Sequence, residues 1–383
     1  MRALRLSVLA TMLFAAGCSA PQVAPVETLA TPIAGPSPTA QPAAAASSPA
    51  GEARPTIIPS ATAIAPTATP LGGPRPAGVA VAPNAPRVLL QPMTHEYETW
   101  NNCAPVTAEM VLSFFGIHRT QAQIAPILRP NPKNFSVRLD QIGTFLTGYG
   151  LQAHPLVGGT LELLKQFASN GIPVVTEDQL SLQEDYGHFR VVRGYDDAAG
   201  VIILGDSYYG PENRLPYNLY SELWKRHDYA FMPVYRPSQA AIVQAILGAR
   251  FDASTNDAAA SAAARQMVAA NPSDAFAWLD LGQDLFQQGE FGPAISAWQR
   301  ARAGPLTPRT LWYTIWPAAA YNHLGQYTQA LAVTTVPLAG DPNNAAALLQ
   351  KGLAERALGR GAPARADLAQ AIAIDPSLAG AAA

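Results

Sequence analysis

Three glycines recur at nearly equal intervals in the C-terminal part of the chain, and this repetition limits the fold more than any other feature. Gly289, Gly325 and Gly359 lie 36 and 34 residues apart. An alanine follows each glycine by five residues. Small residues at fixed places let paired helices approach each other, and the glycine permits the tight turn between them. The pattern therefore predicts stacked helix pairs with a period near 34 residues.

This repetition resembles tetratricopeptide repeats. The stretch Trp278-x-x-Leu281-Gly282-x-x-Leu285 carries the signature best. The resemblance implies an all-α solenoid over residues 238–380. Its three units cover 274–307, 308–341 and 342–376, and residues 239–271 form a degenerate leading helix pair. Such an array either binds a peptide or protein partner on its concave face or serves as a spacer or cap for the preceding domain.

The N-terminus carries an export signal. Arg2 and Arg5 precede a short apolar run, and small residues lead up to Cys18. The end of this segment resembles the bacterial lipoprotein cleavage box. The resemblance implies removal of residues 1–17 and lipidation of Cys18, which would hold the exported protein on the outer face of a bacterial membrane without spanning it. The alternative is an ordinary signal peptide with an incidental cysteine.

A long polar segment separates this signal from the folded part. Residues 18–86 are rich in Pro, Ala, Thr and Ser and hold few large apolar side chains. Because such a composition buries too little apolar surface to offset the entropy of ordering the chain, we expect a disordered tether. About 300 residues remain, which is enough for two domains. A net charge of −2 and 14% charged residues give no indication of a nucleic-acid partner.

The remaining cysteine stands at a distinctive place. Cys103 follows the turn-forming stretch Trp100-Asn101-Asn102 and opens an apolar helical pattern that Gly116 ends. Asn102 is the predicted N-cap of this helix. The unpaired amides and the positive dipole end at a helix start favour a thiolate over a thiol. Cys103 is therefore a candidate nucleophile, and the alternative is a small buried hydrophobic side chain.

The region around Cys103 predicts helices followed by an antiparallel sheet. Helical patterns cover about 103–115, 139–146 and 161–169, and strands are predicted at 88–90, 172–175, 188–195 and 201–206. A turn over 196–200 joins the last two strands. Helices before strands give an α+β layout.

The turn at 196–200 brings two polar side chains together. Asp206 lies opposite either His188 or Arg190, and both registers put His188 and Asp206 on one face of the sheet in direct or diagonal contact. A carboxylate there can hold the imidazole in one tautomer and stabilise its protonated form, and the imidazole can keep Cys103 as a thiolate. The order Cys, His, Asp along the chain matches the papain-like plan.

Three runs of sequence resemble the family thirty-nine-like cysteine peptidases, which are related to the bacteriocin-processing double-glycine peptidases. They are HEYETWNNCAP at 95–105, GHFRVVRGYDD at 187–197 and GDSYYGP at 205–211. The resemblance covers about residues 87–237 and implies a papain-like peptidase domain that needs no cofactor. It also implies Cys103 as the nucleophile, His188 as the base and Asp206 as the orienting acid.

One residue departs from this family in a way that affects catalysis. Glu98 stands where the family usually has a glutamine whose side chain donates to the oxyanion. An ionised carboxylate only accepts hydrogen bonds and repels the developing charge. A protonated Glu98, the amides of Asn101 or Asn102, or the Cys103 backbone N–H can supply the donor instead. The resemblance thus implies either an active peptidase or a catalytically impaired peptidase-like domain that binds peptides or proteins as a scaffold.

The other candidate ligands and binding residues leave simpler interpretations open. No two of the five histidines other than His188 sit at metal-ligand spacing, and with Cys18 lipidated no second cysteine is available, so the sequence predicts no metal site. Tyr208, Tyr209 and Trp224 either line a substrate groove or belong to the core. Together these features predict a membrane-anchored extracytoplasmic hydrolase of peptide or amide bonds, with repeats that recruit its substrate or a partner.

Overall fold

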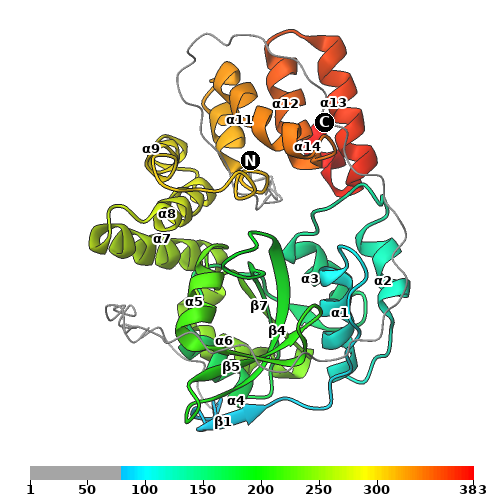
Figure 1. Cartoon of the computed structure of the whole chain (residues 1–383), viewed down its shortest axis with the longest axis vertical. Helices are drawn as coiled ribbons and strands as arrows, with labels where there is room; N and C mark the ends of the chain where they lie inside the picture. Colours follow the sequence, from blue (N-terminus) through cyan, green and yellow to red (C-terminus); the bar gives the residue numbers. More distant parts are fainter. Residues whose placement is uncertain (1–78) are drawn as a thin grey trace, which may run out of the picture. The chain divides into compact units, whose positions relative to one another are not determined.

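A computed structural model describes residues 79–383. The predicted signal segment, Cys18 and most of the predicted tether lie outside these described residues. A domain of mixed helices and strands comes first, and a helical region follows it (Figure 1). Within the described part of the chain, no helix combines the length and the apolar character needed to cross a membrane.

The first helices of the mixed domain surround the predicted nucleophile. Helix α1 (Cys103–Phe114) begins at the cysteine itself, and Gly116 ends it with φ +81°. Helices α2 (Gln121–Leu128), α3 (Leu139–Thr147) and α4 (Leu161–Ser169) follow. The sequence patterns predicted α1, α3 and α4 but not α2, which has only eight residues and contains Pro126.

The strands form one antiparallel sheet in the order β2-β7-β3-β4-β5-β6, and β1 also pairs with β4. The strands are β1 (Arg87–Leu89), β2 (Gln152–Ala153), β3 (Val174–Gln179), β4 (Gly187–Asp196), β5 (Val201–Asp206), β6 (Gly210–Pro216) and β7 (Phe231–Tyr235). Helix α5 (Tyr217–Lys225) connects β6 to β7. The sequence patterns missed β2, β6, α5 and β7.

The register of β4 with β5 decides between the two predicted pairings. Asp206 lies opposite Arg190, so His188 is its diagonal neighbour on the same face. The register shifts between Val192 and Gly194, which marks an irregularity further along the same pair of strands. The end of β4 that carries His188 lies before this shift.

Both faces of the sheet are covered. On one face, α1, α2 and α3 pack side chains such as Met110 and Ile142 against Val191 of the sheet. On the other face, α4 and α5 pack against strand side chains, and Trp224 of α5 is 1% exposed, so it belongs to the core. Helix α6 (Ala240–Leu247) joins this second core, so the core extends beyond residue 237.

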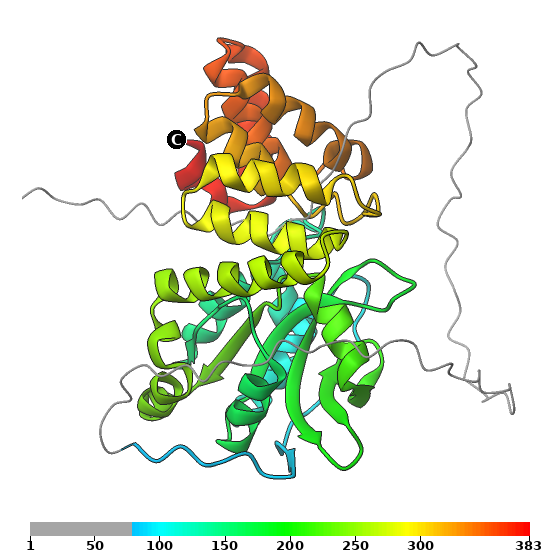
Figure 2. The same ribbon diagram turned by 90° about the vertical axis from the view of Figure 1, so that its left-hand side faces the viewer.

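The helical region continues from α6. Its helices are α7 (Ala253–Ala270), α8 (Ala275–Gln287), α9 (Phe291–Ala301), α10 (Trp316–His323), α11 (Tyr327–Gly340), α12 (Ala345–Ala357), α13 (Gly361–Ile374) and α14 (Ala379–Ala382). The members of the pairs α8–α9, α10–α11 and α12–α13 pack against each other (Figure 2). Gly289, Gly325 and Gly359 stand between the members of these pairs with φ of +77°, +69° and +75°, a backbone conformation that glycine adopts without steric cost.

Candidate active site

Cys103 is the first residue of α1 and is half-buried. The prediction that the side chain of Asn102 caps this helix is wrong, because that side chain is engaged elsewhere. Its Oδ1 accepts a hydrogen bond from Arg129 Nη1 at 2.7 Å, and its Nδ2 donates to Thr99 Oγ1 at 2.7 Å. The first-turn amides of Cys103 and Ala104 have no partner within the helix and none from the cap residue, so they remain available near the sulfur.

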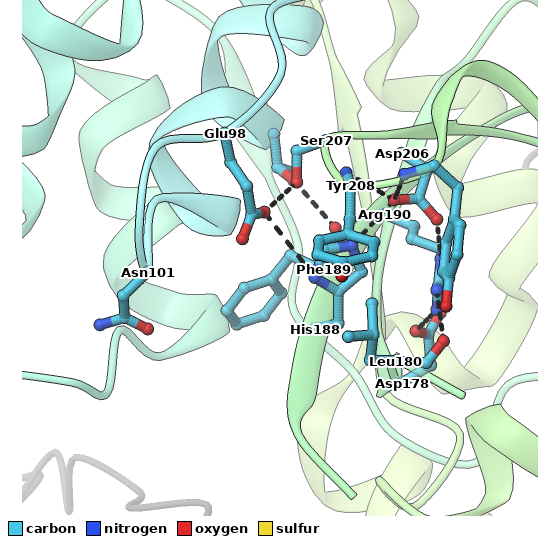
Figure 3. Close-up of polar contacts among 12 residues, drawn as sticks. Glu98, Asn101, Asp178, Leu180, His188, Phe189, Arg190, Asp206, Ser207 and Tyr208 are labelled. Carbon is cyan, nitrogen blue, oxygen red and sulfur yellow. Dashed lines mark hydrogen bonds and ion pairs between the residues drawn. The ribbon is translucent and has the colours of Figure 1, made fainter. Parts of the chain in front are cut away.

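His188 links the helix start to the sheet. Its Nε2 donates to Asp206 Oδ1 at 3.0 Å, and its side chain is almost fully buried. This bond leaves Nδ1 for the other side of the ring, where Glu98 Oε2 lies 4.0 Å away. The side-chain ligand atoms of Glu98, Cys103 and His188 all lie within 4.8 Å of one another. Figure 3 shows Glu98 and His188 facing each other, with Asp206 beyond the ring.

Asp206 receives hydrogen bonds on both oxygens. Oδ1 accepts from His188 Nε2 and from the backbone amides of Tyr208 and Tyr209 at 2.9 and 3.0 Å. Oδ2 accepts from Arg190 Nε at 2.6 Å and from Asn213 Nδ2 at 2.9 Å. Burial alone would raise the pKa of Asp206, but the hydrogen bond from His188 and the charge of Arg190 lower it far below its usual range. The carboxylate is therefore ionised and fixed in one orientation.

Arg190 is a fully buried cation beneath the site. It pairs with Asp206 and Asp178, and its Nη2 donates to the backbone oxygen of Leu180 at 2.9 Å (Figure 3). Burial opposes its charge, but the two carboxylates outweigh that effect and raise the pKa of Arg190. Sequence reasoning used Arg190 only as a register position. The signal that could have revealed its role is a charged side chain two residues after His188 on an inward-facing strand position.

The surroundings of His188 favour the protonated imidazole. Burial disfavours the charged ring, but hydrogen bonds to Asp206 and Cys103 prevail and raise the pKa of His188 to about 9. A protonated ring beside a sulfur atom stabilises a thiolate by direct charge attraction. The arrangement can therefore support nucleophilic attack by sulfur and proton return by the imidazole.

Glu98 is held beside these groups by Ser207. Its backbone N–H donates to the backbone oxygen of Ser207 at 3.0 Å, and its carboxylate accepts a hydrogen bond from the Ser207 hydroxyl. Asn101, in contrast, has φ +59°, and its side chain points away from His188 and Glu98 (Figure 3). Of the predicted oxyanion-region residues, only Glu98 therefore turns its side chain toward the sulfur and the ring.

Gln121 organises the loop that carries Glu98, and sequence reasoning missed it. Its Nε2 donates to Tyr97 O at 2.8 Å and to Glu96 Oε2 at 2.9 Å, while its Oε1 accepts from Thr99 N at 2.9 Å. Gln121 is the first residue of α2, a helix that the pattern did not predict. A buried glutamine with three loop contacts is recognisable only once the loop and α2 are brought together.

The mixed domain is similar in sequence to a known protein family. The sequence pattern of the Peptidase_C39 like family matches residues 88–230. A search of curated proteins returned no match. A C39-like peptidase structure from Bacillus anthracis matches with 15% identity and a TM-score of 0.32, over 39% of this chain and 98% of that one.

Two further structures belong to transporter-associated peptidases. The double glycine motif protease of an AMS/PCAT transporter, solved with a leader peptide, has 14% identity and a TM-score of 0.28, over 39% of this chain and 92% of that one. The peptidase domain of Streptococcus ComA, a bi-functional ABC transporter involved in a quorum-sensing pathway, has 14% identity and a TM-score of 0.28. The match covers 37% of this chain and 96% of that one. Residues 88–230 of this chain form a Peptidase C39-like domain, and a helical region follows it.

Proposed function

We propose that this protein is a cysteine peptidase that hydrolyses a peptide or amide bond through an acyl-thioester on Cys103. The Cys103 thiolate attacks the carbonyl carbon, and His188 gives its proton to the leaving amine. His188 then takes a proton from the water that hydrolyses the thioester, and the thiolate is restored. Asp206 acts as a positioning residue, because its hydrogen bond holds the imidazole with Nδ1 toward the sulfur.

The contacts of His188 carry this proposal. One ring nitrogen is bonded at 3.0 Å to a buried carboxylate, and the other side of the ring faces a half-buried sulfur at a helix start. A histidine with a purely structural role needs no thiol beside it and no raised pKa. His188 has both, and its pKa is raised to about 9. The backbone amides of Cys103 and Ala104 are the donors that we assign to the developing oxyanion.

Exposed aromatic side chains near the site favour a peptide substrate. Tyr97 and Trp100 flank Glu98 in the loop before α1 and are 65% and 73% exposed. Tyr208 and Tyr209 follow Asp206 directly and are also exposed. Of the predicted groove residues, these two tyrosines therefore stay candidates, whereas Trp224 does not. Aromatic rings combine a large apolar surface with few rotatable bonds, which suits contact with extended peptide side chains.

We further propose the remaining parts of the sequence-based scheme. Residues 1–17 would be an export signal and Cys18 the lipid attachment site, with the chain on the outer face of a bacterial membrane. The helix pairs α8–α9, α10–α11 and α12–α13 would be tetratricopeptide repeats that recruit the substrate or a protein partner. The support is the recurring positive-φ glycine between the helices of each pair.

Peptide-library cleavage tests the proposed chemistry. The full chain should release fragments that a Cys103→Ala variant does not release. The Cys103 thiol, measured in a Cys18→Ser background, should react with iodoacetamide at neutral pH faster than a free cysteine does. If no peptide is cleaved and the thiol reacts no faster than free cysteine, the domain is a peptidase-like binding module instead.

A further inference from the structure

Glu98 adds a carboxylate to the thiol and the imidazole that thiol hydrolysis uses, so three potential metal ligands surround one point. Glu98, Cys103 and His188 offer one oxygen, one sulfur and one nitrogen from three separate places: the loop before α1, the start of α1 and strand β4. These three ligand atoms lie within 4.8 Å of one another. Among the described residues, no other group of histidine, cysteine and acidic side chains meets this condition.

We infer that Glu98, Cys103 and His188 form a binding site for Zn²⁺. Zinc lies about 2.3 Å from thiolate sulfur and about 2.0–2.2 Å from imidazole nitrogen and carboxylate oxygen, which puts ligand atoms roughly 3.5 Å apart. The three ligand atoms lie within 4.8 Å of one another, so side-chain movements of roughly 1 Å bring them to this spacing. One thiolate and one imidazole favour zinc over magnesium or calcium, which take oxygen ligands.

The surroundings of each ligand support this assignment. A zinc-bound histidine usually donates its second ring N–H to a carboxylate, and His188 Nε2 donates to Asp206 at 3.0 Å. Ligating carboxylates are in turn hydrogen-bonded, and Ser207 donates to Glu98 Oε2. Both partners lie next to each other at the end of β5, so one short segment orients two of the three ligands.

Three protein ligands leave a fourth tetrahedral position open. Glu98 and Cys103 are only partly buried, so water can occupy that position. Binding releases the Nδ1 proton of His188 to solvent, and the metal then occupies lone pairs of both the Cys103 thiolate and Nδ1. Where the proposed hydrolysis holds, a bound zinc ion therefore blocks the nucleophile and the proton carrier together. The binding site itself does not depend on that activity.

Cobalt and zinc titration of the full chain tests the site. In a Cys18→Ser background, Cys103 is the only thiol, so any sulfur-to-cobalt charge-transfer absorption reports on it. We expect one Co²⁺ per chain with this absorption, its loss in Cys103→Ala, and displacement of Co²⁺ by Zn²⁺. Absence of the sulfur-to-cobalt absorption at saturating Co²⁺ overturns the inference.

Glu98→Gln separates this site from adventitious binding to the thiol. It removes an anionic ligand but keeps the side-chain size, so Zn²⁺ affinity should fall by about tenfold to a hundredfold or more. The control Glu212→Gln removes an exposed carboxylate of β6 and should leave the affinity unchanged. Equal affinities in Glu98→Gln and the control would overturn the inference. Melting temperatures in chelator verify that each variant is folded.

Hydrolysis assays in chelator keep the two proposals distinguishable. Cleavage by the metal-free chain, together with failure to bind zinc, contradicts only the metal site. Zinc binding without cleavage by the metal-free chain contradicts only the proposed hydrolysis. When both hold, Zn²⁺ should inhibit cleavage reversibly, and Glu98→Gln should require about tenfold to a hundredfold more Zn²⁺ for the same inhibition.

Discussion

At the residue scale, the Glu98 carboxylate would act in opposite ways on the two charges of the proposed Cys103–His188 pair. This carboxylate lies 4.0 Å from His188 Nδ1, where it stabilises the protonated ring before reaction. The same negative charge lies near the sulfur, where an oxyanion would form. In the resting ion pair, attraction to the ring and repulsion of the neighbouring thiolate oppose each other, whereas repulsion of the oxyanion raises the energy of the transition state. This repulsion of the oxyanion would slow the chemical step of the proposed hydrolysis.

We predict that Glu98→Gln raises kcat/KM for peptide hydrolysis in the presence of chelator. An oxyanion donor is typically worth a hundredfold or more, so replacing a repelling carboxylate by a donating amide should give a gain of about tenfold to a hundredfold. Glu98→Ala, which removes the charge but supplies no donor, should gain less. Progress curves on one cleaved peptide measure all three proteins. An unchanged or lower rate in Glu98→Gln would show that residue 98 does not face the reacting carbonyl.

A second residue-scale prediction concerns Glu109, which is buried in α1. Burial, followed by repulsion from Glu96, raises the pKa of Glu109 to about 7 from an ordinary 4.5. The folded state therefore binds more protons than the unfolded state between these values, so stability falls as pH rises from about 4.5 to 7. Glu109→Gln should be more stable than the unchanged protein at pH 8, by about 1 kcal/mol after solvent screening, but not at pH 4.5.

Urea unfolding at the two pH values measures this difference. Glu162→Gln, which alters an exposed carboxylate hydrogen-bonded to Asn84, is the control and should show no such pH dependence. A stability gain for Glu109→Gln that is the same at both pH values would contradict the assigned titration. The expected sign follows from the raised pKa alone, because a lowered carboxyl pKa would give stability that grows with pH.

The sequence revealed the site residues whose positions depend on residues nearby in the sequence. Cys103 could be placed at a helix start because the turn and the apolar pattern are contiguous. Asp206 could be placed near His188 because a short turn joins their strands. The side-chain partner of Asn102 could not be predicted, since Arg129 comes from beyond α2. The same holds for the contact of Glu98 with Ser207, which joins residues 109 positions apart.

At the scale of elements, strand β4 positions the site because it pairs with β3, β5 and β1. Its pairing with β1 depends on a missing side chain at Gly194. A Cβ atom there would meet the backbone oxygen of Val88 at 2.0 Å. Real Cβ atoms do not approach backbone that closely, so β1 can lie on β4 only when residue 194 is glycine.

We predict that Gly194→Ala displaces β1 and lowers the free energy of unfolding by about 2 kcal/mol or more, as overpacking commonly does. Gly292→Ala in α9 is the matched control, because a Cβ atom there meets nothing within 4 Å. In a helix that change should be stabilising by up to about 1 kcal/mol. Chemical unfolding of both variants gives the two values. Similar effects of the two substitutions would contradict the close approach of β1.

Element prediction failed where length and pattern were weakest. Strand β6 reads Gly-Pro-Glu-Asn-Arg-Leu-Pro, which has one large apolar residue and proline as its second and last residues. The prolines are tolerated because β6 lies at the edge of the sheet, where one side of the strand forms no hydrogen bonds to a neighbouring strand. Strand β7 contains Pro233 but is fully buried. Tertiary packing, which no local pattern contains, holds both strands in place.

At the scale of the whole described chain, ion pairs join the helical region to the C39-like domain. Arg138 at the start of α3 pairs with Asp375 at the end of α13 at 2.9 Å, and their side chains are 6% and 8% exposed. Lys225 of α5 pairs with Asp274 before α8 at 3.2 Å. Arg309, between α9 and α10, pairs with Asp185 next to β4 at 3.1 Å. The Arg309–Asp185 pair thus connects the helical region to the segment that leads into β4.

A double-mutant cycle on Arg138 and Asp375 tests this junction. Each single change, Arg138→Met or Asp375→Asn, leaves a buried charge with one partner fewer, whereas the double change removes both charges. The double variant should therefore lose less stability than the sum of the two single losses, by about 1–3 kcal/mol in urea unfolding. The exposed pair Arg214–Glu212, at 3.3 Å, is the control and should couple by less than about 0.5 kcal/mol. A coupling in the Arg138–Asp375 cycle as small as this control would mean that the two regions do not hold each other through this contact.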